Sequence, residues 1–176
     1  MTYREELFRA MDVLAQDDRT LFLGQCVVNS GTFMYHTLKN IPLTKRIEMP
    51  VIEDTQMGIS IGLALAGYVP VSVYPRMDFL ICATNQLANH LDKIAEMSSG
   101  QFNPKVIVRS AVGSTNPLFP GPQHCNDYCD SLRSSLRNVD VVQLREAAQI
   151  VPAYRQALDS PRSTVVIEYP DLYDSS

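Results

Sequence analysis

Apolar positions along the chain alternate between helical and extended spacing, without the signals of tight hairpins between the extended segments. In residues 3–15, Leu7, Ala10, Met11 and Leu14 recur on one helical face and predict an amphipathic helix. Extended and helical patterns then alternate to the end of the chain. The predicted strands are 21–24, 45–49, 69–74, 105–110, 139–144 and 164–168, and the later helices are 32–40, one beginning near residue 53, 79–98, 125–136 and 146–158. This order predicts an α/β fold with a mostly parallel sheet and helices on both faces.

The size and composition of the chain predict one domain. With 176 residues, 45% of them hydrophobic, the chain can bury one core and is too short for two, so residues 1–176 are expected to form a single domain. Residues 56–75 contain no charged side chain, but Gly67 and Pro70 divide them into a buried helix and a buried strand. The charged amino terminus lacks the apolar core of a secretory signal, so a cytoplasmic location is expected.

Charge and cysteine usage exclude several classes of partner. A net charge of −4 gives no electrostatic reason to expect a nucleic acid or an anionic membrane. Four cysteines show no disulfide framework and are expected to be reduced. His124, Cys125 and Cys129 could form half of a metal site, but no second ligand pair is evident and we predict no metal ligands in this chain.

A carboxylate stands at a predicted element boundary. Pro50 favours extended geometry before it, while Asp54 and Thr55 suit the electropositive first turn of a helix, so the helix is expected to begin near Glu53. By residue type alone, Glu53 could simply interact with the helix dipole. This interpretation does not identify a reaction.

Small residues recur at every fourth position of the same helix, at Gly58, Gly62 and Ala66. Glycine inside a helix costs roughly 0.5–1 kcal/mol relative to alanine, so two of them suggest a close backbone contact that offsets this cost. The contact could be tight packing within the subunit or a seam with another chain.

Residues 46–67 resemble the pyrimidine-binding domain of thiamine-diphosphate enzymes, in particular the β subunit of the decarboxylase component of 2-oxo-acid dehydrogenases and its transketolase relatives. The family pattern has a Pro, two apolar or small residues and a Glu, and then a Gly-x-x-x-Gly helix that ends in Ala-Gly. This chain matches it with Pro50-Val51-Ile52-Glu53, Gly58, Gly62 and Ala66-Gly67. The resemblance spans nearly the whole chain. Further matching positions are Asp78, Phe79, Asn85, Gln86, Asn89, Lys93, Arg109, Gly113, Gln123 and His124.

The resemblance implies the three-layer thiamine-diphosphate-binding fold and assigns roles to five residues. Glu53 is implied to contact N1′ of the aminopyrimidine and help that ring accept a proton, which requires a desolvated carboxyl group. Phe79 would stack on the ring, and Val51 and Met77 would complete the cofactor-binding surface. His124 would handle protons or hold a carboxylate of the substrate. The implied catalytic residues are thus Glu53 and His124; by residue type alone, Phe79 could be a core aromatic and His124 an ordinary residue at a helix start.

The resemblance also implies a partner. Relatives hold the diphosphate through Mg²⁺ on a Gly-Asp-Gly signature followed by Asn, and this sequence contains no Gly-Asp-Gly. An α-type subunit carrying the diphosphate and Mg²⁺ is therefore expected, in a heterotetramer with two copies of each chain. The Gly58–Gly62–Ala66 face would form the seam.

Two departures from the family pattern leave the reaction open. The family carries acidic residues where this chain has Gln25-Cys26. Arg76 stands where the family has a small polar residue. Arg76 could select a carboxylate or phosphate of the substrate, or it could be a solvated surface arginine. The family's further carboxyl-terminal domain is absent, so the sequence is either an excised domain or a reduced, freestanding enzyme. We expect 2-oxo-acid decarboxylation, acyloin formation, or ketol or acyl transfer. The alternatives are a non-catalytic regulatory or binding module with the same fold and an unrelated flavodoxin-like domain.

Overall fold

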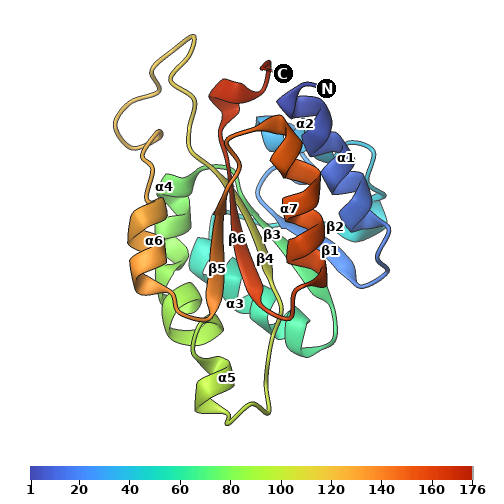
Figure 1. Cartoon of the computed structure of the whole chain (residues 1–176), viewed down its shortest axis with the longest axis vertical. Coiled ribbons are helices and arrows are strands. Elements are labelled where there is room, and N and C mark those ends of the chain that lie inside the picture. Colours follow the sequence, from blue (N-terminus) through green and yellow to red (C-terminus); the bar gives the residue numbers. More distant parts are fainter. Residues whose placement is uncertain (176) are drawn as a thin grey trace.

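The computed structural model, which describes residues 1–175, builds these residues around one six-stranded sheet (Figure 1). All pairings are parallel, in the order β2-β1-β3-β4-β6-β5. The strands are β1 (Thr20–Gly24), β2 (Arg46–Glu48), β3 (Val69–Tyr74), β4 (Ile107–Ala111), β5 (Val139–Gln143) and β6 (Ser163–Glu168). The predicted α/β class with a parallel sheet is confirmed.

Helices cover both faces of the sheet and make three layers (Figure 1). One face carries α1 (Tyr3–Ala15), α2 (Phe33–Leu38) and α7 (Ala147–Asp159). The other carries α3 (Glu53–Leu65), α4 (Met77–Leu80) and α6 (Cys129–Ser135), with α5 (Ile94–Met97) beyond them. No helix within residues 1–175 is long and apolar enough to cross a membrane.

Alternation along the strands divides the core into two clusters. Successive side chains of a strand point to opposite faces of the sheet. In β3, Val71 and Val73 join the cluster under α1 and α7, whereas Tyr74 joins the cluster under α3 and α6. Every residue of β3 is buried because helices cover both of its faces, which explains the near-continuous apolar run of this strand.

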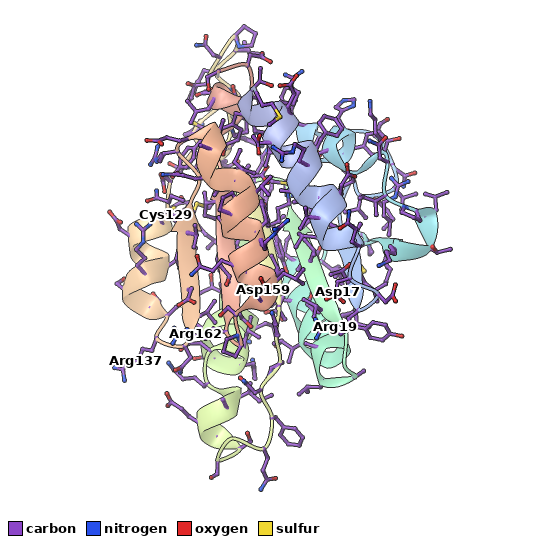
Figure 2. The ribbon with its side chains drawn as sticks, turned by 45° about the vertical axis from the view of Figure 1, so that its right-hand side comes forward. Asp17, Arg19, Cys129, Arg137, Asp159 and Arg162 are labelled. Atoms are coloured by element: carbon purple, nitrogen blue, oxygen red, sulfur yellow. The ribbon has the colours of Figure 1, made fainter. Side chains whose placement is uncertain are left out.

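The amino ends of the strands lie at the edge of the sheet marked by Asp17, Arg19 and Asp159 (Figure 2). There α1 and α7 end, side by side on one face (Figure 2). Arg19 donates hydrogen bonds to both carboxylate oxygens of Asp17 and lowers the pKa of Asp17 to about 2. The carboxyl ends of the strands lie at the opposite edge, where the candidate site is found.

The long helix predicted for residues 79–98 is wrong in detail. It begins at Met77 and is broken into α4, a 3-10 turn (Ile81–Ala83), a π-helical segment (Gln86–Leu91) and α5. Long-range polar contacts compete with regular helical geometry there, since Gln86 donates to Asp54 at 3.4 Å and Asp92 bonds the start of β5. The helix predicted for residues 125–136 begins later, at Cys129, whose backbone N–H is capped by Asp127 at 3.0 Å.

Asp92 fastens the broken helical segment to the edge strand β5. Its buried carboxylate accepts backbone hydrogen bonds from Arg137 at 2.8 Å, Asn138 at 2.7 Å and Val139 at 3.2 Å, and pairs with Lys93. Burial alone would raise the pKa of Asp92, but the hydrogen bonds from Lys93 and from the backbone of Asn138 and Arg137 outweigh it and lower the pKa.

Replacing Asp92 with Asn is expected to lower the free energy of unfolding by about 1–3 kcal/mol, because an amide cannot replace the charge-assisted bonds to Lys93 and the backbone. Because the pKa of Asp92 is lowered in the native state, the stabilisation that its charged form contributes decreases at acid pH. The stabilisation is complete above the unfolded-state pKa of about 4 and is lost as the pH falls through the lower native value. Urea unfolding of both proteins between pH 7 and pH 3 checks this, with the gap between them narrowing toward acid. The control is Asp130→Asn, whose side chain is fully exposed and which should match the wild type.

Candidate functional site

Three predicted site residues, and Gln25 in addition to them, lie at the carboxyl edge of the sheet. Gln25 directly follows β1, Glu53 begins α3 just beyond β2, Phe79 lies in α4 after β3, and His124 belongs to the segment after β4. Carboxyl ends of parallel strands share one edge, and ligands of open α/β sheets bind there. The candidate site therefore lies at one edge of the sheet, where Gln25, Glu53, Phe79 and His124 are found.

Glu53 is buried, with 8% of its surface exposed, at the first position of α3. Its Oε1 accepts a hydrogen bond of 3.0 Å from Nε2 of Gln25, and its backbone carbonyl accepts one of 3.3 Å from the Tyr74 hydroxyl. No donor within residues 1–175 bonds its Oε2. The carboxylate is thus held from one side and keeps one oxygen for a further partner.

Gln25 is a site residue that was not predicted from the sequence. The sequence showed only that position 25 departs from the family pattern. The amide donates to Glu53, whereas a carboxylate at position 25 would repel it. The loop that carries Gln25 is shaped by Glu48, which ends β2. The carboxylate of Glu48 accepts four backbone N–H groups, those of Cys26 at 2.7 Å, Val27 at 3.0 Å, Val28 at 2.6 Å and Asn29 at 3.1 Å.

Only one feature of the sequence pointed toward Glu48. It is an acidic residue at the end of an extended segment, two residues before Pro50, and such positions are common in surface turns. The backbone donors that surround it come from a loop about twenty residues earlier, so the contact depends on strand pairing that sequence spacing does not reveal.

Phe79 and His124 lie together. Their ring centroids are 5.6 Å apart and the rings meet at 87°, an edge-to-face arrangement that stabilises aromatic pairs. Nη1 of Arg76 donates to the carbonyl oxygen of His124 at 3.2 Å. Within residues 1–175, the buried Nδ1 of His124 has no hydrogen-bond partner. The structure thus brings two of the predicted site residues into contact.

Gly113 permits the close approach that positions His124. A Cβ atom at Gly113 would lie 1.6 Å from the carbonyl oxygen of His124 and 2.7 Å from its carbonyl carbon. Such overlap is impossible without moving the backbone, so only glycine fits this contact. Gly113 lies two residues beyond the end of β4, and the strand therefore fixes one side of the loop that carries His124.

The other two predicted cofactor-binding residues differ in exposure. Val51 is 75% exposed, on the surface just before α3. Met77 is 1% exposed, and its Sδ accepts the backbone N–H of Tyr128 at 3.3 Å. Val51 therefore offers its side chain to an incoming group, while Met77 supports α4 from within the core.

The cysteines near His124 face separate partners. Sγ of Cys125 bonds the carbonyl oxygen of Gly121 at 3.6 Å, and Sγ of Cys129 lies 3.8 Å from the Tyr169 hydroxyl. Burial, together with the neighbouring Asp127, raises the pKa of Cys129 to about 12 and keeps it a thiol at neutral pH. The described residues contain no group of three or more His, Cys, Asp or Glu side chains placed to hold a metal ion.

The two glycines of α3 have different surroundings. A Cβ at Gly58 would meet the side chain of Gln86 at 3.7 Å, so this glycine packs within the subunit. A Cβ at Gly62 would meet nothing within 4 Å. Around Gly62 the helix exposes apolar side chains, with Ile59 40% and Leu65 46% exposed. No contact within the described chain offsets the helical cost of Gly62.

Several known proteins are similar to this chain in sequence or in fold. No family model matches the chain. It is 23% identical to the pyruvate dehydrogenase E1 component subunit beta of Cyanidium caldarium over 180 residues, which covers 99% of this chain and 54% of that protein. It is 29% identical to the mitochondrial counterpart of Drosophila melanogaster over 134 residues, 71% of this chain and 35% of the relative.

A solved structure of a split gene transketolase, an inactive β4 tetramer, superimposes with a TM-score of 0.73 at 18% identity, over 96% of this chain and 51% of that one. The chain is homologous to E1 β subunits and has a transketolase-like fold. It spans about half or less of the length of these relatives.

Replacing Gly113 with Ala is expected to push the backbone of His124 away from β4 and to destabilise the protein by more than about 1 kcal/mol, because the added methyl group overlaps a carbonyl. Urea unfolding measures the stability, and the imidazole resonances of His124 report its displacement. The matched control is Gly62→Ala, in which the added methyl group enters open space. An unshifted His124 spectrum in Gly113→Ala would contradict the role given to this glycine.

Proposed function

We propose that this chain is the pyrimidine-side subunit of a two-chain thiamine-diphosphate enzyme that breaks or forms a carbon–carbon bond beside a carbonyl. The observation that carries the proposal is the buried carboxylate of Glu53, fixed by Gln25 through one oxygen and open at the other, at the carboxyl edge of a transketolase-like sheet. The homologous E1 β subunits support the same assignment. 2-Oxo-acid decarboxylation, acyloin formation, and ketol or acyl transfer are the reactions of this class that we consider.

The residues of the chain fit the pyrimidine half of the cofactor. The open Oε2 of Glu53 can share a proton with a weakly basic ring nitrogen, and the burial of the group favours that sharing over hydration. Phe79 and the exposed Val51 provide apolar surface near the ends of their strands, on which an aromatic ring can pack. When bound, thiamine diphosphate supplies a carbanion that adds to carbonyl carbon and then serves as an electron sink.

His124 is suited to act on the substrate rather than on the cofactor. Its carbonyl is tied to Arg76 and its ring to Phe79, so the ring orientation is constrained, while Nδ1 lacks a partner within the described chain. An imidazole held in this way can exchange a proton with a group that enters from the strand ends.

The diphosphate and its Mg²⁺ are assigned to an α-type partner chain. The described residues offer no carboxylate cluster for the metal, and the apolar face around Gly62 is a suitable seam. Small residues allow close approach of a second helix backbone, so a heterotetramer of two copies of each chain is the assembly that we propose. Cofactor binding should then require both chains.

Replacing Glu53 with Gln is expected to reduce turnover of the assembled enzyme by at least about a hundredfold, because an amide cannot exchange the proton that the pyrimidine needs. Thiamine diphosphate should still bind, since size and packing are kept. Steady-state rates and calorimetric titration of the cofactor, with Mg²⁺, measure the two effects separately. Asp54→Asn is the control: it removes the same charge from the same helical turn, and its rate should stay near the wild type. Full activity in Glu53→Gln, with the cofactor still bound, would remove Glu53 from the mechanism.

Replacing Gly62 with Leu is expected to leave the free energy of unfolding of the chain alone equal or higher, because leucine favours helix by about 0.5–1 kcal/mol over an exposed glycine. The same change should weaken assembly at least tenfold, because the side chain fills the gap that a neighbouring helix needs. Analytical ultracentrifugation of the mixed chains measures the second effect. Ala148→Leu, on the exposed part of α7, is the control for added apolar surface. Undiminished assembly of Gly62→Leu would remove this face from the interface.

A further inference from the structure

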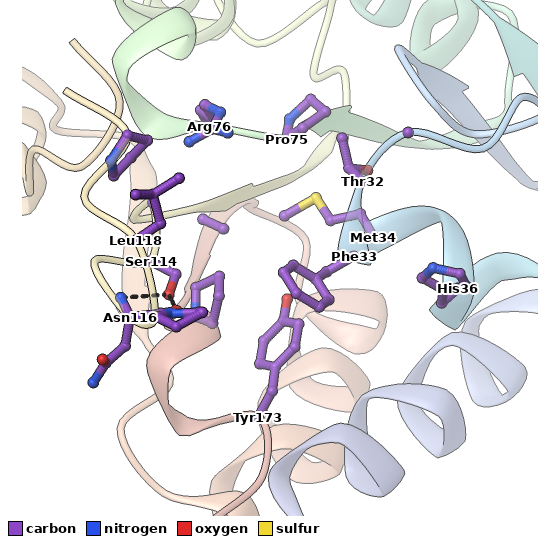
Figure 3. A pocket seen from close by; sticks show the side chains of 16 residues that line it. Thr32, Phe33, Met34, His36, Pro75, Arg76, Ser114, Asn116, Leu118 and Tyr173 are labelled. Carbon is purple, nitrogen blue, oxygen red and sulfur yellow. Dashed lines mark hydrogen bonds between the residues drawn. The ribbon is translucent and has the colours of Figure 1, made fainter.

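A cavity of about 480 Å³ opens at the carboxyl edge of the sheet. Figure 3 shows side chains that line it. The β1–α2 loop, the residues after β3, the segment after β4, and Tyr173 line it. Arg76 and Gly113 connect it to the candidate site because both contact the backbone of His124. Its volume falls in the range of small-molecule sites.

The lining of the cavity is mostly apolar, with the polar side chains of Thr32, His36, Arg76, Ser114, Asn116 and Tyr173 among the apolar ones. Figure 3 shows Leu118 on one side of the space, and Met34, Phe33 and Tyr173 on another. A ligand hydroxyl group loses its hydrogen bonds to water when it enters a cavity. Proline has no backbone N–H and cannot donate a hydrogen bond to replace them. The lining includes Pro75, Pro117, Pro120 and Pro170.

Arg76 is the one lining residue with a permanent charge, and no Asp or Glu lines the cavity. Arg76 is half-buried, and apart from the bond of Nη1 to the carbonyl of His124 its guanidinium group makes no hydrogen bond or ion pair with residues 1–175. A partly desolvated arginine without a counter-ion binds a carboxylate through its planar set of N–H groups. Apolar walls with one such cation suit an apolar body that carries one acid group.

We propose that this cavity binds an organic carboxylate with an apolar body, and that Arg76 is its counter-ion. Glu53, Phe79 and His124 do not line the cavity, so the site can exist whether or not the function proposed above is correct. For Arg76, the proposal favours ligand recognition over a solvated surface arginine, the two possibilities that the sequence left open.

The test uses the chain of residues 1–176 with phenylacetate, its uncharged analogue phenylacetamide, and inorganic phosphate as probes. Calorimetry measures binding, and NMR follows the residues in the lining. Phenylacetate should bind at least about tenfold more tightly than either of the others. Arg76→Gln should remove that preference by weakening phenylacetate alone. Equal binding of acid and amide, or unchanged phenylacetate binding in Arg76→Gln, would overturn the proposal.

Because Arg76 also bonds to His124, a second pair of variants keeps the test decisive if Arg76→Gln does not fold. Leu118 lines the cavity with 77% of its surface exposed, so a polar residue there should not disturb the core. Leu118→Asp should bind phenylacetate about fivefold more weakly than the isosteric Leu118→Asn, through charge repulsion. The two should bind phenylacetamide equally. No difference between them for phenylacetate would contradict a site that recognises charge.

Discussion

The buried ion pair between Arg109 and Glu168 organises the carboxyl edge of the sheet. Both side chains are fully buried on the neighbouring strands β4 and β6, with Nε to Oε1 at 2.6 Å and Nη2 to Oε2 at 3.1 Å. Removing two charges from water costs several kcal/mol per ion, which their attraction offsets only when the remaining polar atoms are also bonded. Two tyrosine hydroxyls donate to the carboxylate, Tyr154 at 2.7 Å and Tyr173 at 2.8 Å, whereas the buried Nη1 of Arg109 has no hydrogen-bond partner within residues 1–175. Burial, together with the charge of Glu168, raises the pKa of both tyrosines, which remain neutral donors.

This pair links the core to the two sites. Arg109 lies two residues before the end of β4, from which Gly113 leads into the loop of His124. Glu168 ends β6, and its partner Tyr173 stacks on Tyr3 at 5.6 Å and lines the cavity beside Arg76. The hydroxyl of Tyr3 in turn donates to Leu144 at 2.8 Å and accepts from the backbone of Tyr169 at 3.2 Å. Hydrogen bonds and the Tyr3–Tyr173 stack therefore connect the first helix, the inner strands β4 and β6 and the carboxyl-terminal segment, and the loops that leave these strands have fixed starting points.

Local pattern was enough to predict the strands and the longest helices, because apolar spacing records which face is buried. Helix α1 agrees with its prediction, and Glu53 does begin a helix. The pattern was insufficient where distant polar groups shape the backbone. The helical segment is irregular where Asp92 accepts backbone hydrogen bonds at the start of β5. The loop after β1 is shaped by hydrogen bonds from its backbone to Glu48, about twenty residues later. Arg109 matched the family pattern in sequence, but its complete burial depends on Glu168, a carboxylate 59 residues away that no spacing rule pairs with it.

The neighbourhood of Glu53 connects the proposed chemistry to the proposed assembly. In the chain alone the carboxylate is nearly buried, but beside it Val51 and Ile52 expose 75% and 39% of their surface. Such apolar side chains next to a carboxylate gain from being covered, and covering them removes the remaining water from Oε2. A carboxyl group shares a proton with a weak base more readily as it is desolvated. Under the proposed function, the partner chain therefore does more than hold the diphosphate: by closing over Val51 and Ile52 it places Glu53 in the environment that its reaction needs.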